Sequence, residues 1–154
     1  EKEASDRVAA YKKKAEARLH VATLRVKSMA ALALSTARTH AKSQVIAMVK
    51  RKAMDALEQV AGKPEYGRVL EALAEEAMKA VETPEAVILH PQDEMKLRAW
   101  ATQRGLELRA DPRLHLGVRI VARGGQRSVV NSLPERLNRA WEALASDMAR
   151  RLWG

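Results

Sequence analysis

Four histidines are the residues of this chain best suited to catalysis or metal binding: His20, His40, His90 and His115. No two of them have the spacing of a metal site, and the chain has no cysteine to assist. His20 and His40 fall in a long helical stretch, where we expect them to face solvent. His90 and His115 have side chains suited to acid–base or metal chemistry, but isolated histidines are more often structural. The histidines therefore give little support for an enzyme.

Other groups that commonly carry chemistry are missing or lie in the wrong context. The lack of cysteine excludes thiol catalysis and disulfides and fits a reducing compartment. The carboxylate pairs Glu75-Glu76 and Asp93-Glu94 are expected on helix surfaces. Gly124-Gly125 lies between two predicted strands and lacks the lysine and hydroxyl residue of a phosphate-binding loop. We predict no catalytic, cofactor-binding or metal site, and no cofactor.

The element that dominates the chain is the stretch 1–61, which contains neither glycine nor proline. It is rich in Ala, Lys, Arg, Leu and Met, which lose little entropy in a helix. Gly62 and Pro64 then give a stop signal, with Gly62 as the residue after the helix cap. A single helix of this length would measure about 90 Å. We expect it to project from a globular body and to contact something else.

Apolar residues recur along this stretch at spacings of 4-3-4-4-3-4-4-3-4-4, which is an eleven-residue repeat. A seven-residue repeat starting at Val8 reaches Met29 and then fails at Thr36. An eleven-residue stripe stays on one side of a helix when the helix supercoils right-handedly around a partner. We predict that this stripe is a coiled-coil interface, made of Ala4, Val8, Tyr11, Ala15, Leu19, Ala22, Val26, Ala30, Ala33, Ala37 and Ala41. The alternative is a helical hairpin that turns at residues 35–40, which no glycine or proline supports.

Positive charge is concentrated in the same stretch. The chain carries a formal net charge of +9, and residues 1–62 hold 13 Lys/Arg against 6 Asp/Glu. Between Glu16 and Asp55 there is no acidic residue at all. A helix with one sign of charge needs an acidic partner, which could be a Glu-rich helix, nucleic acid or anionic lipid.

Residues 62–154, which we call the head, show alternating helix and strand signals, so the fold class is α+β with a mixed sheet of about four strands. A strand, helix and strand in succession predict a parallel crossover, and Gly124-Gly125 predicts a hairpin. Ser132 and Glu135 form a capping box that opens the last helix. The predicted helices are 65–81, 92–104 and 133–152, and the predicted strands are 86–89, 106–108, 118–122 and 128–130.

Binding to nucleic acid or to a membrane has less support. The aromatic residues do not alternate with the basic ones, and we expect Trp100 and Trp141 on core faces. No apolar run is long enough to span a bilayer. We therefore predict no nucleic-acid partner and no direct membrane span, although a basic helical nucleic-acid-binding or scaffold protein remains the alternative.

Three segments resemble the E subunit of the V/A-type ATP synthases, in its bacterial form. They are residues 35–41, 116–121 and 130–144, and the last is the most specific because a short hairpin leads into Asn-Ser-Leu at the start of the final helix. The signature positions are Gly117, Asn131, Ser132, Leu133, Arg136 and Leu137, while Pro134 departs mildly from the family pattern. The likeness covers the whole chain, and we expect the natural protein to continue N-terminally.

The resemblance implies a peripheral-stalk (stator) component of a rotary proton-translocating complex, without catalytic residues of its own. The helix 1–61 would pair with the helical G subunit, for which the charge pattern predicts an acidic sequence. The head 62–154 would dock on the catalytic A/B hexamer, mainly on the B subunit, with Asn131 and Arg136 as interface candidates. The N-terminal end would reach the membrane stator subunit, so that the protein is cytoplasmic and peripheral to the membrane. Such a stalk resists rotor torque and keeps ATP synthesis or hydrolysis coupled to proton transport.

Overall fold

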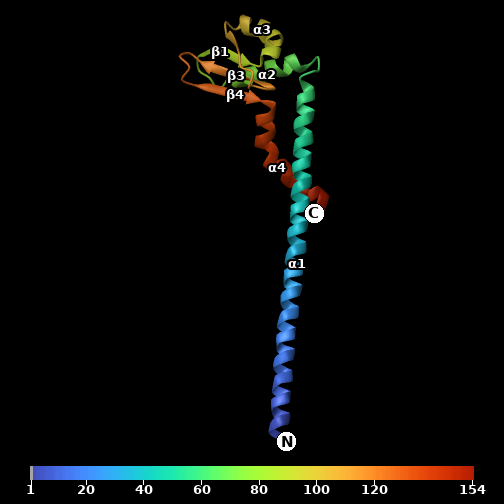
Figure 1. The fold of residues 1–154 in the computed structure, drawn as a ribbon. Coiled ribbons are helices and arrows are strands. Elements are labelled where there is room, and N and C mark those ends of the chain that lie inside the picture. Colours follow the sequence, from blue (N-terminus) through green and yellow to red (C-terminus); the bar gives the residue numbers. More distant parts are fainter. Residues whose placement is uncertain (1) are drawn as a thin grey trace. The chain divides into compact units, whose positions relative to one another are not determined.

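The computed structural model describes residues 2–154; Glu1, where the predicted helix begins, lies outside the described residues. The described residues up to Val45 form one compact unit, and Ile46–Gly154 form the other. The elements, most of them labelled in Figure 1, are α1 (Lys2–Val60), α2 (Tyr66–Met78), β1 (Pro84–Leu89), the short 3₁₀ helix η1 (Pro91–Asp93), α3 (Glu94–Gln103), β2 (Glu107–Ala110), β3 (Gly117–Ala122), β4 (Ser128–Ser132) and α4 (Leu133–Trp153).

The long helix predicted from composition is confirmed. α1 is unbroken over 59 residues (Figure 1), so the chain does not turn back at residues 35–40. Every residue from Lys2 to Val45 is exposed. Gly62 comes two residues after Val60, the last residue of α1, which is the position predicted for it, but it lacks the positive φ of a left-handed cap. The helix ends instead in a turn, in which Lys63 N–H donates to Val60 O at 3.0 Å.

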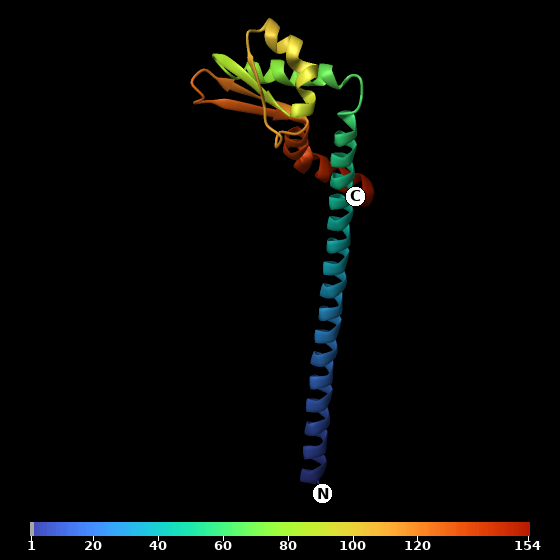
Figure 2. The same ribbon diagram turned by 45° about the horizontal axis from the view of Figure 1, so that its top comes forward.

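A four-stranded mixed sheet in the order β2-β1-β3-β4 forms the centre of the head. β1 and β2 are parallel, as the strand–helix–strand order predicted, while β1–β3 and β3–β4 are antiparallel. The predicted hairpin is present, and Gly124 and Gly125 take positive φ values of 78° and 71°. Figure 2 shows its turn at the end of the sheet opposite to the start of α4.

The core lies between the sheet and α2 and α3. The register places Leu108, Val87, Ile120 and Val129 in one row across the four strands. α2 packs on β3 and β4 and also contacts α3, so both helices cover the same face. The fully buried large side chains are Tyr66, Leu70, Leu89, Leu97, Ile120, Val87 and Val118.

Two predicted helices differ in detail from the sequence expectation. The third helix begins as η1 before α3, and α3 ends at Gln103. Gly105, just beyond, has a φ of 66° that lets Leu106 N–H donate to Ala101 O at 3.0 Å. In α4 no residue is buried. The expectation that Trp141 lies on a core face is therefore wrong: Trp141 is half-buried, with Lys50 Nζ 5.5 Å from its ring centroid. Trp100 is buried as expected.

Candidate partner-binding surfaces

The apolar stripe of α1 is left uncovered by residues 2–154. All eleven predicted stripe residues are exposed, and the large ones remain far from buried: Tyr11 is 75% exposed, Leu19 69% and Val26 66%. Burying a large apolar side chain is worth roughly 1.5–3 kcal/mol. Because the stripe exposes apolar side chains over many helical turns, covering it with a binding partner would be favourable.

Small residues make up most of the stripe. Seven of its eleven positions are alanine. Alanine keeps the helix propensity high and allows two helix backbones to approach closely. The stripe therefore suits a second helix better than a globular surface.

The stripe ends where α1 begins to contact the head. Continued beyond Ala41, the eleven-residue series would fall on Gln44, Met48, Lys52 and Asp55, all of which are exposed. The half-buried apolar residues of this segment have other positions in the helical repeat; they are Ile46, Val49, Ala53, Met54, Leu57 and Val60. Leu57 and Val60 pack against the core. The residues that pack against the head are therefore not a continuation of the stripe.

The middle of α1 is basic and contains no acidic residue. The span 17–54 holds eight Lys/Arg and no acid, so the i,i+4 pairs that usually stabilise an exposed helix cannot form within it. Arg7–Glu3 near the N-terminus, at 3.0 Å, shows what such a pair looks like in this helix. The span therefore favours an acidic partner.

Asn131, a predicted interface residue, lies inside the head. It is 5% exposed and occupies the core-facing row beside Val118. Its Nδ2 donates to Leu73 O at 2.9 Å, and its Oδ1 accepts from Arg136 Nε at 2.9 Å. Arg136, the second predicted interface residue, is also ion-paired with Glu76 and keeps a side-chain exposure of 40%. Both residues thus join α4 and β4 to α2, and their contact with a partner stays a prediction.

The other signature positions surround this junction. Ser132 Oγ accepts from Glu135 N–H at 3.4 Å, which is the first half of the predicted capping box. Leu133 N–H donates to Leu116 O at 2.9 Å. Gly117 pairs with Ser132 across the strands, where no room exists for a side chain. The signature is therefore largely the joint between the hairpin and α4.

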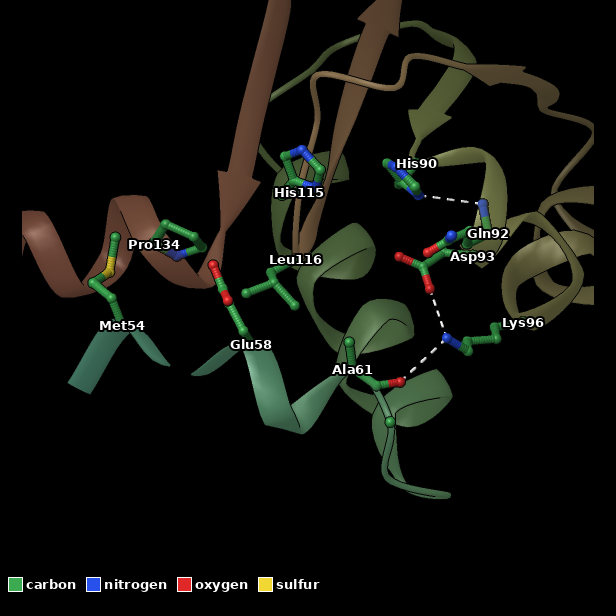
Figure 3. A pocket seen from close by; sticks show the side chains of 11 residues that line it. Met54, Glu58, Ala61, His90, Gln92, Asp93, Lys96, His115, Leu116 and Pro134 are labelled. Atoms are coloured by element: carbon green, nitrogen blue, oxygen red, sulfur yellow. Dashed lines mark hydrogen bonds and ion pairs between the residues drawn. The ribbon is translucent and has the colours of Figure 1, made fainter. Parts of the chain in front are cut away.

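The structure brings together two histidines that sequence spacing had kept apart. The rings of His90 and His115 lie next to each other (Figure 3), with centroids 5.0 Å apart. They border a cavity of about 690 Å³, which Glu58 and Asp93 also line. His90 follows β1 and His115 precedes β3, so the antiparallel pairing of these strands was the signal that could have found them.

His90 already uses one ring nitrogen within the fold. Its Nδ1 accepts from Gln92 N–H at 3.3 Å and caps η1. A metal on Nε2 would require a proton on Nδ1, and a protonated Nδ1 cannot accept that bond. Within residues 2–154, no three His, Asp or Glu side chains are grouped to hold a metal ion. The histidine pair is better explained as part of the cavity wall.

The expectation that Asp93 lies on a helix surface is wrong: it is 6% exposed and lies beside this cavity. Through Lys96 it connects the head to the end of α1. Lys96 Nζ lies 2.6 Å from Asp93 Oδ1 and donates to Ala61 O at 3.4 Å (Figure 3). Tyr66 O–H donates to Asp93 Oδ2 at 3.4 Å. Burial raises the pKa of the Tyr66 phenol, and the neighbouring negative charge of Asp93 raises it further. These contacts fix the start of the head at the end of α1.

Features suited to a membrane or to nucleic acid are weak in the described part of the chain. Within residues 2–154, every helix is too short or too polar to form a bilayer-spanning segment. Trp100 is 5% exposed and donates from Nε1 to Glu75 at 3.1 Å. Such a ring cannot stack on a base, which disfavours the single-strand mode of nucleic-acid binding.

These features define a class of protein: a mixed α+β chain whose long amino-terminal helix presents an unburied apolar stripe. Residues 1–153 match the family described as ATP synthase (E/31 kDa) subunit, and the chain belongs to this family. The V-type ATP synthase E subunit of Thermus thermophilus is 42% identical over 130 residues, which are 84% of this chain and 69% of the relative. The Deinococcus radiodurans protein of the same name is 36% identical over 129 residues, with the same two coverages.

Proposed function

We propose that this chain is a peripheral-stalk (stator) component of a rotary V/A-type ATP synthase and contributes no catalytic residue. The observation that carries the proposal is the exposed apolar stripe from Ala4 to Ala41 on an unbroken helix. The relatives are named as E subunits of V-type ATP synthases, which supplies the complex in which such a helix would work. The stalk holds the catalytic hexamer against rotor torque, so that proton transport stays coupled to ATP synthesis or hydrolysis.

The stripe pairs with the G subunit in a right-handed coiled coil. The eleven-residue period supports the handedness, and the acid-free span supports an acidic sequence in the partner. In this division of labour, residues 1–61 form the pairing helix and 62–154 the head. The head docks on the A/B hexamer, mainly on the B subunit, and the N-terminal end reaches the membrane stator subunit. The protein is thus peripheral to the membrane on its cytoplasmic side.

Co-expression with the matching G subunit, followed by analytical ultracentrifugation, tests the pairing. We expect a 1:1 heterodimer that survives purification, and we expect its affinity to fall as salt rises, because the charges are solvent-exposed. A chain that stays monomeric in excess G subunit would overturn the proposal.

The basic helix also makes nucleic-acid binding an alternative function that should be tested. Titration of the chain with duplex DNA at physiological salt measures this affinity. Binding tighter than about 1 μM, beyond the usual non-specific range, combined with no binding to the G subunit, would favour the alternative.

A further inference from the structure

The arginines at the tip of the β3–β4 hairpin differ from most others in the head. Eight of the twelve head arginines form ion pairs with carboxylates. Arg123 and Arg127 are exposed, and neither forms an ion pair within the described chain. Two guanidinium groups, at the first and last positions of one five-residue turn, therefore have their donors available to a ligand.

The turn that carries them is fixed by backbone bonds. Arg123 N–H donates to Thr83 O at 2.8 Å, and Ala122 N–H donates to Arg127 O at 2.9 Å. Gly124 N–H donates to Glu85 Oε2 at 3.0 Å, so the nearest carboxylate of β1 is directed at the turn's backbone. A turn held in this way loses little freedom when it binds a partner.

A shallow hollow lies beside the two arginines. Its volume is about 360 Å³, and it is lined by Arg123, Arg127, Gln126, Thr83 and Glu82, among others. The lining contains one acidic residue, Glu82, and two arginines, so its net charge is positive. Guanidinium groups match a carboxylate through two parallel N–H···O bonds, and Gln126 can add a further donor.

We propose that the tip of this hairpin binds carboxylate side chains on an acidic protein surface, and that this surface belongs to the catalytic hexamer. The identity of the partner rests on the proposed function. A protein surface is favoured over a membrane, because lipid recognition generally needs four or more clustered basic residues. It is favoured over nucleic acid because Val81 and Ala122, not aromatic rings, complete the hollow.

The test uses the full chain paired with the G subunit and measures its affinity for the catalytic hexamer at low and at physiological salt. The double variant R123E/R127E should bind at least about tenfold more weakly, because it turns attraction into repulsion. The control R68E/R139E changes the net charge equally at two exposed arginines that also form no ion pair in the described residues; it should stay within about twofold of the unaltered chain. R123K/R127K keeps the charge but loses the planar guanidinium that can make two parallel bonds to a carboxylate. Its affinity for the hexamer should lie between those of the other two variants.

The outcomes separate this inference from the proposed function. If the unaltered stalk pair fails to bind the hexamer, the proposed function fails. If it binds and R123E/R127E binds equally well, or if R68E/R139E weakens binding as much, the hairpin site is wrong while the function stands. Phosphatidylglycerol vesicles give the last arm: vesicle binding that R123E/R127E abolishes, with hexamer binding unchanged, would assign the site to lipid and overturn the proposal. Circular dichroism checks that each variant is folded.

Discussion

Asn131 combines a polar side chain with a place in the core-facing row of the sheet. Its amide is satisfied from two directions, by Leu73 O and by Arg136 Nε. A buried polar group that is fully bonded can specify one packing arrangement among several apolar alternatives. We interpret Asn131 as the residue that fixes β4 and α4 against α2.

Asn131→Ala should lower the free energy of unfolding by about 1–3 kcal/mol, because the Leu73 carbonyl and the Arg136 guanidinium each lose a buried partner. Urea denaturation measures this loss. Asn138→Ala is the matched control, since Asn138 is exposed on α4, and it should change stability by less than about 0.5 kcal/mol. Equal effects of the two substitutions would contradict the role given to Asn131.

The raised pKa of Tyr66 predicts how the free energy of unfolding changes at alkaline pH. Its pKa is raised in the folded chain by burial and by Asp93, so folding favours the neutral phenol. That contribution is complete below the pKa of an unfolded tyrosine, about 10, and is lost as pH rises above it. Between this value and the higher folded pKa, stability should fall by up to about 1.4 kcal/mol per pH unit.

Tyr66→Phe should flatten this alkaline loss, whereas Tyr11→Phe, at a position 75% exposed, should leave it as it is. Denaturant titrations from pH 8 to 12 provide the measurement. An alkaline slope that is the same in both variants would show that Tyr66 is not its source.

At the scale of elements, the β3–β4 pair depends on one glycine. A Cβ built on Gly117 would overlap Ser132 Cα and lie 2.5 Å from Asn131 O, both of them backbone atoms that cannot move aside cheaply. Gly67 on α2 is the opposite case, because a Cβ there would meet only Lys96, at 3.9 Å or more.

Gly117→Ala should therefore cost about 2–4 kcal/mol through overpacking. Gly67→Ala should be neutral or stabilise by up to about 1 kcal/mol through helix propensity. Thermal unfolding followed by circular dichroism compares the two. A tolerated Gly117→Ala would mean that the strands can separate at this pair, against the role given to the joint.

Local signals predicted most elements, and non-local ones explain what was missed. Periodicity was enough for α1 and α2, and Gly124-Gly125 was enough for the hairpin, since each depends on neighbours along the chain. The histidine pair depends on β1 lying antiparallel to β3, two strands that are not consecutive in the sequence. Gly62 carried the right residue type for a cap, but Gly62 N–H donates instead to Gln59 O at 3.3 Å.

The predicted surfaces also differ in whether they depend on neighbours along the chain or on distant residues. The stripe could be predicted because it is a repeat within one helix. The internal bonds of Asn131 could not, because they reach Leu73 and Glu76, which lie 58 and 55 positions away. The ion pair of Arg136 likewise reaches Glu76 on α2. The free arginines at the hairpin tip were equally out of reach, since whether an arginine is paired depends on which acids the fold brings near.

At the scale of the whole molecule, the proposed function depends on a partner helix covering the stripe. Ala22→Gln with Ala33→Gln keeps helix propensity but places two polar amides in the seam. Affinity for the G subunit should fall at least about tenfold. Ala17→Gln with Ala31→Gln makes the same chemical change off the stripe and should leave affinity within about twofold, as measured by isothermal titration calorimetry. An equal loss of affinity in the two double variants would show that the stripe is not the binding surface.

The chain has no cysteine, so single cysteines can be placed along α1 and cross-linked to a cysteine-bearing G subunit. The decisive positions are those where an eleven-residue and a seven-residue repeat disagree. A right-handed pair built on this stripe predicts strong disulfide formation at Ala30 and Ala37 and weak formation at Met29 and Thr36. Strong cross-linking at Met29 and Thr36 instead, or uniform cross-linking at all four positions, would contradict such a pair.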